Sequence, residues 1–124
     1  DMLGACTFGF TPRGPIPLDM LRDMVDAATG WKVSYWELLK AAERGLNLSR
    51  VFNIREGVTR HDDRLPEKFF TDLADNDGTA IDRKAFEEAQ DLCYEMMGWN
   101  PHTARPTRAK LAELGISWAQ QYME

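Results

Sequence analysis

Three residues near the start of the chain are of types that can bind a cofactor. Asp1, Gly4 and Cys6 lie within residues 1–16, which are rich in glycine and proline and have no sustained period. Such a segment has no helical face that could bury the Cys6 thiol. A carboxylate accepts hydrogen bonds from ligand N–H groups, a glycine allows close backbone approach, and a thiolate binds soft metals. The residue types therefore predict either a cofactor contact or an ordinary exposed loop.

The acidic stretch from Asp75 to Asp82 resembles a calcium-binding loop but lacks the required spacing. An EF-hand loop has glycine at its sixth position and a bidentate glutamate at its twelfth. With Gly78 as the sixth residue, the twelfth is Lys84. A start at Asp75 places alanine at the sixth position and phenylalanine at the twelfth. Both registers fail, so the stretch is predicted to be a turn that leads into a helix.

The cysteines and histidines do not form a zinc motif. Cys6, His61, Cys93 and His102 include no closely spaced ligand pair of the kind that starts a structural zinc site. Both histidines fall in polar stretches and are predicted to be exposed to solvent. Cys93 falls on the apolar face of a predicted helix, where a free cysteine behaves as a small hydrophobic residue.

Composition argues against several classes of function. The chain has 124 residues, a net charge of −5 and a pI near 5.0, which disfavours a nucleic-acid partner. It has no apolar run of about eighteen residues, so no membrane span is predicted. Its start lacks the basic and apolar regions of a signal peptide. Two cysteines are too few for a disulfide framework, so a reducing, cytoplasmic setting is expected. The absence of an initial methionine predicts that the chain is part of a longer protein.

Helix signals are clear in the first half of the chain. The first helix is predicted to begin at Pro17, which suits an initial helical turn, and to end at Gly30. Ser34 and Glu37 have the spacing of a capping box, which predicts the start of a second helix. The apolar stripe of this long helix continues almost to Gly57, which is its predicted end.

The middle of the chain is predicted to be a loop followed by a third helix. Residues 58–81 are polar and rich in turn-forming residues, with one short helical turn expected at residues 67–70. Asp82 is the predicted cap of a helix that reaches about Met97. The predicted buried stripe of this helix consists of Phe86, Ala89, Cys93 and Met96.

A short helix and a final turn complete the predicted fold. Thr107 is expected to cap a helix to Leu114, followed by one or two turns over residues 116–123. No segment has the alternation and turn signals of a hairpin. The predicted fold class is all-α, a small irregular helical bundle. We expect a single domain overall, with an irregular ligand-contacting segment at residues 1–16 and a helical domain at residues 17–124.

An ordered set of short motifs runs along nearly the whole chain. The longest is Asn47-Leu48-Ser49-Arg50-Val51-Phe52-Asn53-Ile54-Arg55-Glu56-Gly57-Val58-Thr59-Arg60, and Asp62-Asp63-Arg64-Leu65-Pro66 follows it. Later motifs are Phe86, Tyr94-Glu95, Gly98-Trp99, Pro106-Thr107, Leu111 and Leu114-Gly115. No single motif is diagnostic, but their order is specific. Together they resemble the C-terminal region of the aldehyde ferredoxin oxidoreductase family.

The resemblance implies an enzyme that holds tungsten, or molybdenum in some relatives, between two pterin dithiolenes beside a [4Fe–4S] cluster. Asp1, Gly4 and Cys6 match the second of two family motifs that each contact a pterin, with Ala5 in place of the usual leucine. The match implies that Asp1, Gly4, Ala5, Cys6 and Thr7 bind the cofactor. It also implies that Cys6 is the last metal-binding cysteine of the cluster, the first three coming from upstream sequence.

The activity implied by the resemblance is oxidation of an aldehyde to a carboxylic acid, with electrons passed through the cluster to ferredoxin. The implied partners are the remaining domains of the parent enzyme, ferredoxin and the aldehyde substrate. The isolated chain is expected to be inactive, to bind no cofactor, and to self-associate through apolar residues that would pack on the missing domains. The alternative is a cofactor-free helical interaction module.

Departures from the family pattern leave the substrate open. Met97 and Asn100 replace an arginine and an aspartate that commonly flank Gly-Trp, and residues 101–105 replace a shorter glycine-containing link. No catalytic residue is predicted. One set of polar residues is expected to tie helix to loop by ion pairs and caps: Arg50, Arg55, Glu56, Asp62 and Asp63.

Overall fold

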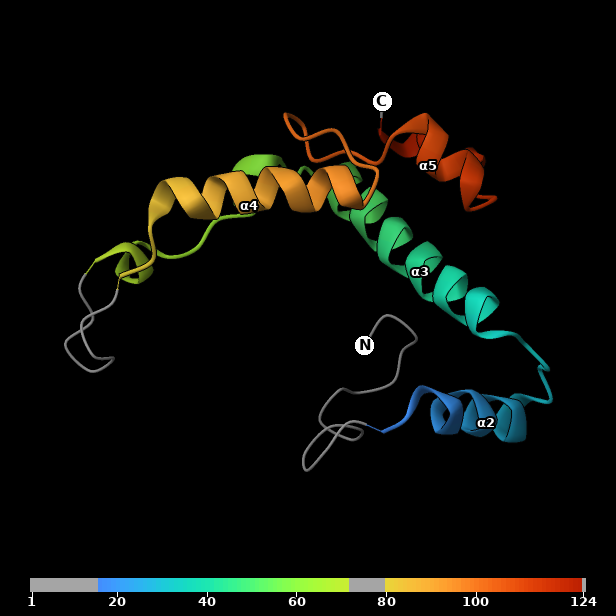
Figure 1. The fold of residues 1–124 in the computed structure, drawn as a ribbon. Coiled ribbons are helices and arrows are strands. Elements are labelled where there is room, and N and C mark those ends of the chain that lie inside the picture. The colour runs from blue at the N-terminus through green and yellow to red at the C-terminus, as the bar shows by residue number, and fades with distance from the viewer. Residues whose placement is uncertain (1–15, 72–79, 124) are drawn as a thin grey trace. The chain divides into compact units, whose positions relative to one another are not determined.

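The computed structural model of the chain describes residues 16–71 and 80–123. Over these ranges it is helical apart from loops and one isolated antiparallel bridge between Trp99 and Pro106, which confirms the all-α class. No helix in the described ranges is long and apolar enough to span a bilayer. The elements in chain order are α2 (Leu18–Thr29), α3 (Tyr35–Arg55), the 3-10 helices η1 (Arg60–Asp62) and η2 (Glu67–Phe70), α4 (Arg83–Met96), α5 (Arg108–Glu113) and the 3-10 helix η3 (Ser117–Met123) (Figure 1).

The chain divides into two compact units, residues 1–49 and residues 50–124, and the division falls within α3. Each unit is described by itself. The expected boundary between residues 16 and 17 adjoins residues outside the described ranges, so that subdivision stays a prediction.

The helices of the first unit begin and end where local signals predict. Gly30 has a φ of 69°, a left-handed conformation that glycine adopts without strain, and its N–H donates to the carbonyl of Asp26. Ser34 and Glu37 form the predicted capping box. Glu37 Oε2 accepts from the Ser34 N–H at 2.8 Å, and Ser34 Oγ accepts from the Glu37 N–H at 3.3 Å. The buried apolar side chains of this unit include Val33, Leu38 and Ala42.

In the second unit, α4 has nearly the predicted ends but turns a different face inward. Asp82 Oδ1 accepts from the Ala85 N–H at 2.9 Å, which confirms the cap. The buried residue of α4 is Tyr94, because its ring stacks on Trp99 and its hydroxyl donates to Asp63. This orientation rotates the predicted stripe toward solvent. The prediction of a buried stripe is wrong at the exposed residues Ala89, Cys93 and Met96.

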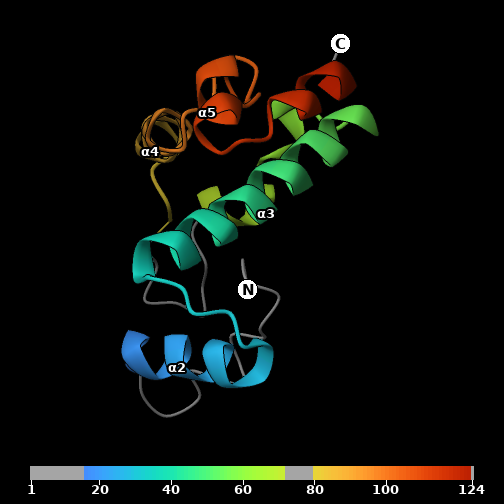
Figure 2. The same ribbon diagram turned by 90° about the vertical axis from the view of Figure 1, so that its right-hand side faces the viewer.

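The C-terminal helices supply most of the apolar core of the second unit. Thr107 Oγ1 accepts from the Lys110 N–H at 3.2 Å and caps α5 as predicted. The helices α5 and η3 contact each other and lie side by side in both views (Figure 1, Figure 2). The buried apolar residues in this part of the chain are Leu111, Leu114, Ile116, Ala119 and Met123.

Candidate functional site

The residues predicted to contact a cofactor lie outside the described residues. The same holds for Asp75 to Gly78 of the tested calcium loop. The structure therefore neither supports nor contradicts the roles predicted for Asp1, Gly4, Ala5, Cys6 and Thr7. What the structure does describe is a buried polar hub and two hollows, all within the second unit.

The hub is centred on a bidentate ion pair between Arg50 and Asp63. Nη1 and Nη2 of Arg50 donate to Oδ1 and Oδ2 of Asp63 at 2.9 and 2.6 Å. The third contact runs from Arg50 Nε to the carbonyl of Ala104 at 2.9 Å. Arg50 is only 6% exposed, so its guanidinium needs these partners to offset the loss of hydration. One side chain thereby ties α3 to the loops on either side of α4.

Two aromatic residues and an amide complete the hub. The Tyr94 hydroxyl donates to Asp63 Oδ2 at 2.7 Å, and Gln90 Nε2 donates to the Asp63 carbonyl. The Tyr94 and Trp99 rings stack with centroids 5.9 Å apart, and the Arg50 guanidinium carbon lies 5.2 Å from the Trp99 centroid. Stacked rings and a cation over an aromatic face restrict the orientation of the ion pair.

The hub shifts the pKa values of its two acidic groups in opposite directions. Burial alone raises the pKa of Asp63, but hydrogen bonds from Arg50 and Tyr94 outweigh burial and hold it below its ordinary value. Burial and the neighbouring Asp63 carboxylate raise the pKa of Tyr94 to about 12. Asp63 therefore stays ionised and Tyr94 stays protonated at neutral pH, which is the charge state that the hub needs.

The predicted helix-to-loop ties are confirmed for part of the set. Asp62 caps η1, since its Oδ2 accepts from the Thr59 N–H at 2.8 Å and from the Thr59 hydroxyl at 2.9 Å. These hydrogen bonds lower the pKa of Asp62. Arg55 and Glu56 instead pair with each other at 2.8 Å on the exposed end of α3. That pair joins neighbouring residues and ties no loop.

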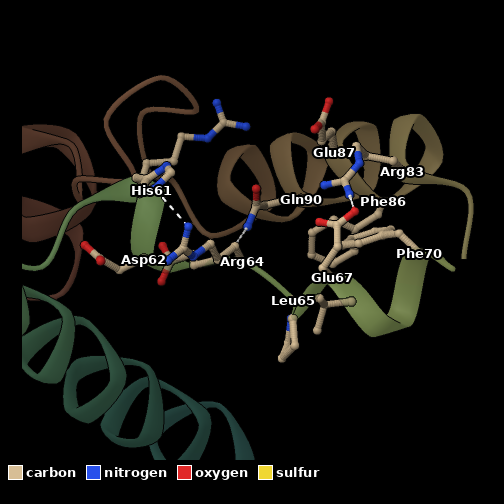
Figure 3. A pocket seen from close by; sticks show the side chains of 13 residues that line it. His61, Asp62, Arg64, Leu65, Glu67, Phe70, Arg83, Phe86, Glu87 and Gln90 are labelled. Carbon is tan, nitrogen blue, oxygen red and sulfur yellow. Dashed lines mark hydrogen bonds and ion pairs between the residues drawn. The ribbon is translucent and has the colours of Figure 1, made fainter.

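Beside the hub lies an open hollow of about 1070 Å³, which we call the η2 hollow. Figure 3 shows its wall, formed by η1, the loop that follows it, η2 and α4. Arg83 pairs with Glu67 at 2.5 Å and lies 4.0 Å from the Phe70 ring centroid. Arg64 Nη1 lies 3.1 Å from His61 Nε2 (Figure 3). The wall mixes both signs of charge, and its strongest charges are already paired, so it favours no one ligand.

Metal binding has no support among the residues that the structure describes. Over residues 16–71 and 80–123, no group of three or more His, Cys, Asp or Glu side chains is placed to hold an ion. His61 and His102 are exposed, as predicted. The hub members that sequence reasoning did not connect are Gln90, Tyr94 and Ala104. The spacing of Gln90 and Tyr94 along one helical face was the available signal for two of them.

A model of the family "aldehyde ferredoxin oxidoreductase, domains 2 & 3" matches residues 1–116 of the chain. The chain belongs to the aldehyde ferredoxin oxidoreductase family. The resemblance predicted from the ordered motifs is thereby confirmed. The family match also includes the segment that holds Asp1, Gly4 and Cys6.

Curated members of the aldehyde ferredoxin oxidoreductase family are similar over most of the chain. The identity is 31% over 118 residues with the tungsten-containing aldehyde ferredoxin oxidoreductase of Pyrococcus furiosus. With that of Thermococcus kodakarensis, it is 34% over 121 residues. Each match covers 94% of this chain and 19% of the relative. The chain thus spans about a fifth of the length of these relatives.

A solved structure is similar to this aldehyde ferredoxin oxidoreductase domain at the level of fold and sequence. It is the active site complex BamBC of benzoyl coenzyme A reductase in complex with 1,5-dienoyl-CoA. The superposition has a TM-score of 0.70 at 28% identity and covers 88% of this chain and 15% of that chain. The helical domain therefore occurs in relatives named for different substrates.

Proposed function

We propose that this chain is part of a tungsten–pterin aldehyde ferredoxin oxidoreductase and that residues 1–7 contact its cofactors. The observation that carries the proposal is the family match, which begins at Asp1 and includes Gly4 and Cys6. The names of the curated relatives support tungsten as the metal. When bound, the metal–pterin cofactor supplies the oxidation of an aldehyde to a carboxylic acid, with electrons leaving through the cluster to ferredoxin.

The residue types of the N-terminal segment fit these cofactors. The Cys6 thiolate is a soft ligand of the kind that holds iron–sulfur clusters. The Asp1 carboxylate accepts hydrogen bonds, which suits the N–H groups of a pterin. Gly4 has no side chain to prevent close approach of the backbone to the cofactor. We expect Ala5 and Thr7 to line the same contact.

The chain's own cysteines are too few to hold the cluster. The sequence contains two, Cys6 and Cys93, and Cys93 is exposed on α4. A cluster of the [4Fe–4S] type is held by a larger set of cysteine thiolates. The other ligands and the second pterin contact are proposed to come from the rest of the parent protein, since the matched relatives are about five times longer. We therefore expect the 124-residue chain alone not to oxidise aldehydes.

The complete parent protein offers a direct test through its two cysteines in this region. Cys6→Ser removes the proposed iron ligand, so we expect its reduced iron–sulfur signal in electron paramagnetic resonance to be lost or strongly decreased. Cys93→Ser is the matched control and should keep the signal of the unaltered protein, because Cys93 faces solvent on α4. An unchanged signal in Cys6→Ser removes Cys6 as a ligand and favours the cofactor-free interaction module. Equal losses in both variants would remove the specific assignment.

A second candidate is reduction of an aromatic coenzyme A thioester. The similarity to the benzoyl coenzyme A reductase complex supports it. The curated relatives support aldehyde oxidation at slightly higher identity and almost full coverage of the chain. Assays of the complete protein separate the two. Aldehyde-dependent reduction of an artificial electron acceptor supports the first, whereas consumption of benzoyl-CoA with an added reductant supports the second.

A further inference from the structure

We propose that a second hollow in residues 50–124 binds a phosphate group. It has a volume of about 470 Å³ and includes none of the residues proposed to contact the tungsten–pterin cofactor. We call it the histidine hollow. Two short segments form its wall, one around η1 and one in the loop between α4 and α5. The residues that line it are Val58, Thr59, Arg60, His61, His102, Thr103 and Arg105.

The charge of this wall is one-sided. Arg60, His61, His102 and Arg105 can carry positive charge, and none of the described residues that line the hollow is a carboxylate. The chain as a whole is acidic, with a net charge of −5, so this local excess of cationic groups does not follow from composition. Guanidinium groups match phosphate oxygens in geometry as well as charge. A phosphate also offers more acceptor oxygens than a carboxylate to donors that come from two segments.

Several of these donors are available to a ligand. Arg105 donates to the main-chain carbonyl of Met123 and forms no ion pair with any carboxylate in the described ranges. The ring of His102 has no hydrogen-bond partner among the residues described. Arg60 pairs with Asp91 at 2.6 Å through Nη2, which leaves its other N–H groups to donate.

The nearest carboxylates in the sequence are already engaged elsewhere. Asp62 accepts from the backbone and hydroxyl of Thr59, and Asp63 is held by the hub. Both line the η2 hollow and neither lines the histidine hollow. Because the Thr59 hydroxyl donates to Asp62, the hydroxyl left to donate to a ligand is that of Thr103.

The two histidines of the chain both line this hollow, so imidazole NMR signals report on it directly. Inorganic phosphate is titrated into the 124-residue chain at constant pH and ionic strength, with sodium chloride as the balancing salt. We expect both imidazole signals to shift and to saturate. Arg105→Gln should weaken phosphate binding roughly tenfold, since it removes a charged hydrogen-bond donor. Arg55→Gln, an exposed arginine of α3 that does not line the hollow, is the matched control and should bind as the unaltered chain does.

A second variant covers the case in which Arg105→Gln unfolds because the Met123 contact is lost. His102→Gln removes an exposed ring without a described partner, and we expect it to fold and to weaken phosphate binding several-fold. Shifts that grow in proportion to phosphate without saturation overturn the proposal. Equal weakening by Arg55→Gln does the same. Saturable shifts of equal size with acetate overturn the choice of phosphate and show a general anion site instead.

Discussion

Arg50 shows how one buried guanidinium can hold a loop in an unusual backbone conformation. Its Nε donates to the carbonyl of Ala104, which is 0% exposed and has a φ of 53°, a region that alanine rarely adopts. Arg50→Met keeps an apolar stem but removes the partner of the Asp63 carboxylate and of that carbonyl. We expect it to lower the free energy of unfolding by about 3 kcal/mol, measured by urea denaturation. Arg55→Met is the control on the same helix and should change it by less than about 1 kcal/mol, because its ion pair is exposed. Similar losses in both variants would contradict a special role for the hub.

Tyr94 gives the hub a pH dependence at the alkaline end. The pKa of Tyr94 is raised from 10.0 to about 12, so the folded state favours the protonated phenol more than the unfolded state does. Its contribution to stability is therefore complete below pH 10 and is lost as the pH rises through about 12. Tyr94→Phe should flatten the fall in stability between these two pH values. Urea denaturation of both chains across that range measures it, and an identical pH dependence would show that Tyr94 does not titrate as its surroundings predict.

At the scale of elements, caps fix where the helices start. Asp82 Oδ1 accepts from the Ala85 N–H at the start of α4, the helix that carries Gln90 and Tyr94 into the hub. Asp82→Ala should lower the free energy of unfolding by about 1 kcal/mol. Hydrogen exchange should show faster exchange of the Ala85 amide. Glu88→Ala is the control, because Glu88 is exposed on the same helix, and it should leave that exchange rate unchanged. Unaltered exchange in Asp82→Ala would contradict the cap.

At the scale of the whole molecule, large apolar side chains remain exposed in both units. In the first, Trp36 is 66% exposed; in the second, Met96 is 77% exposed. The chain covers only 19% of its curated relatives, and apolar surface of this kind commonly marks an interface. We expect the isolated chain to self-associate as its concentration rises, as followed by sedimentation velocity, and Met96→Glu to weaken the association. Lys84→Gln changes the net charge equally at an exposed polar position of α4 and should not weaken it. A monomer at every concentration would contradict the expectation.

The sequence by itself determined the helices and the family. Ser34 with Glu37, Gly30, Asp82 and Thr107 act on backbone groups only a few residues away, so their spacing was enough to predict helix ends. The ordered motifs were enough to predict the family that the match over residues 1–116 then showed. The roles of Asp1, Gly4 and Cys6 still rest on motif and residue chemistry, since these residues lie outside the described ranges.

Only the tertiary structure decided which face of α4 is buried and which loops meet. Arg50 lies 54 residues from Ala104, and Tyr94 lies 31 residues from Asp63. Periodicity compares neighbours along one helix, so it placed Cys93 and Met96 inward and could not weigh a tyrosine whose partners are distant. The histidine hollow has the same origin. His61 and His102 seem unrelated in sequence, and they share a wall because the chain folds back between them.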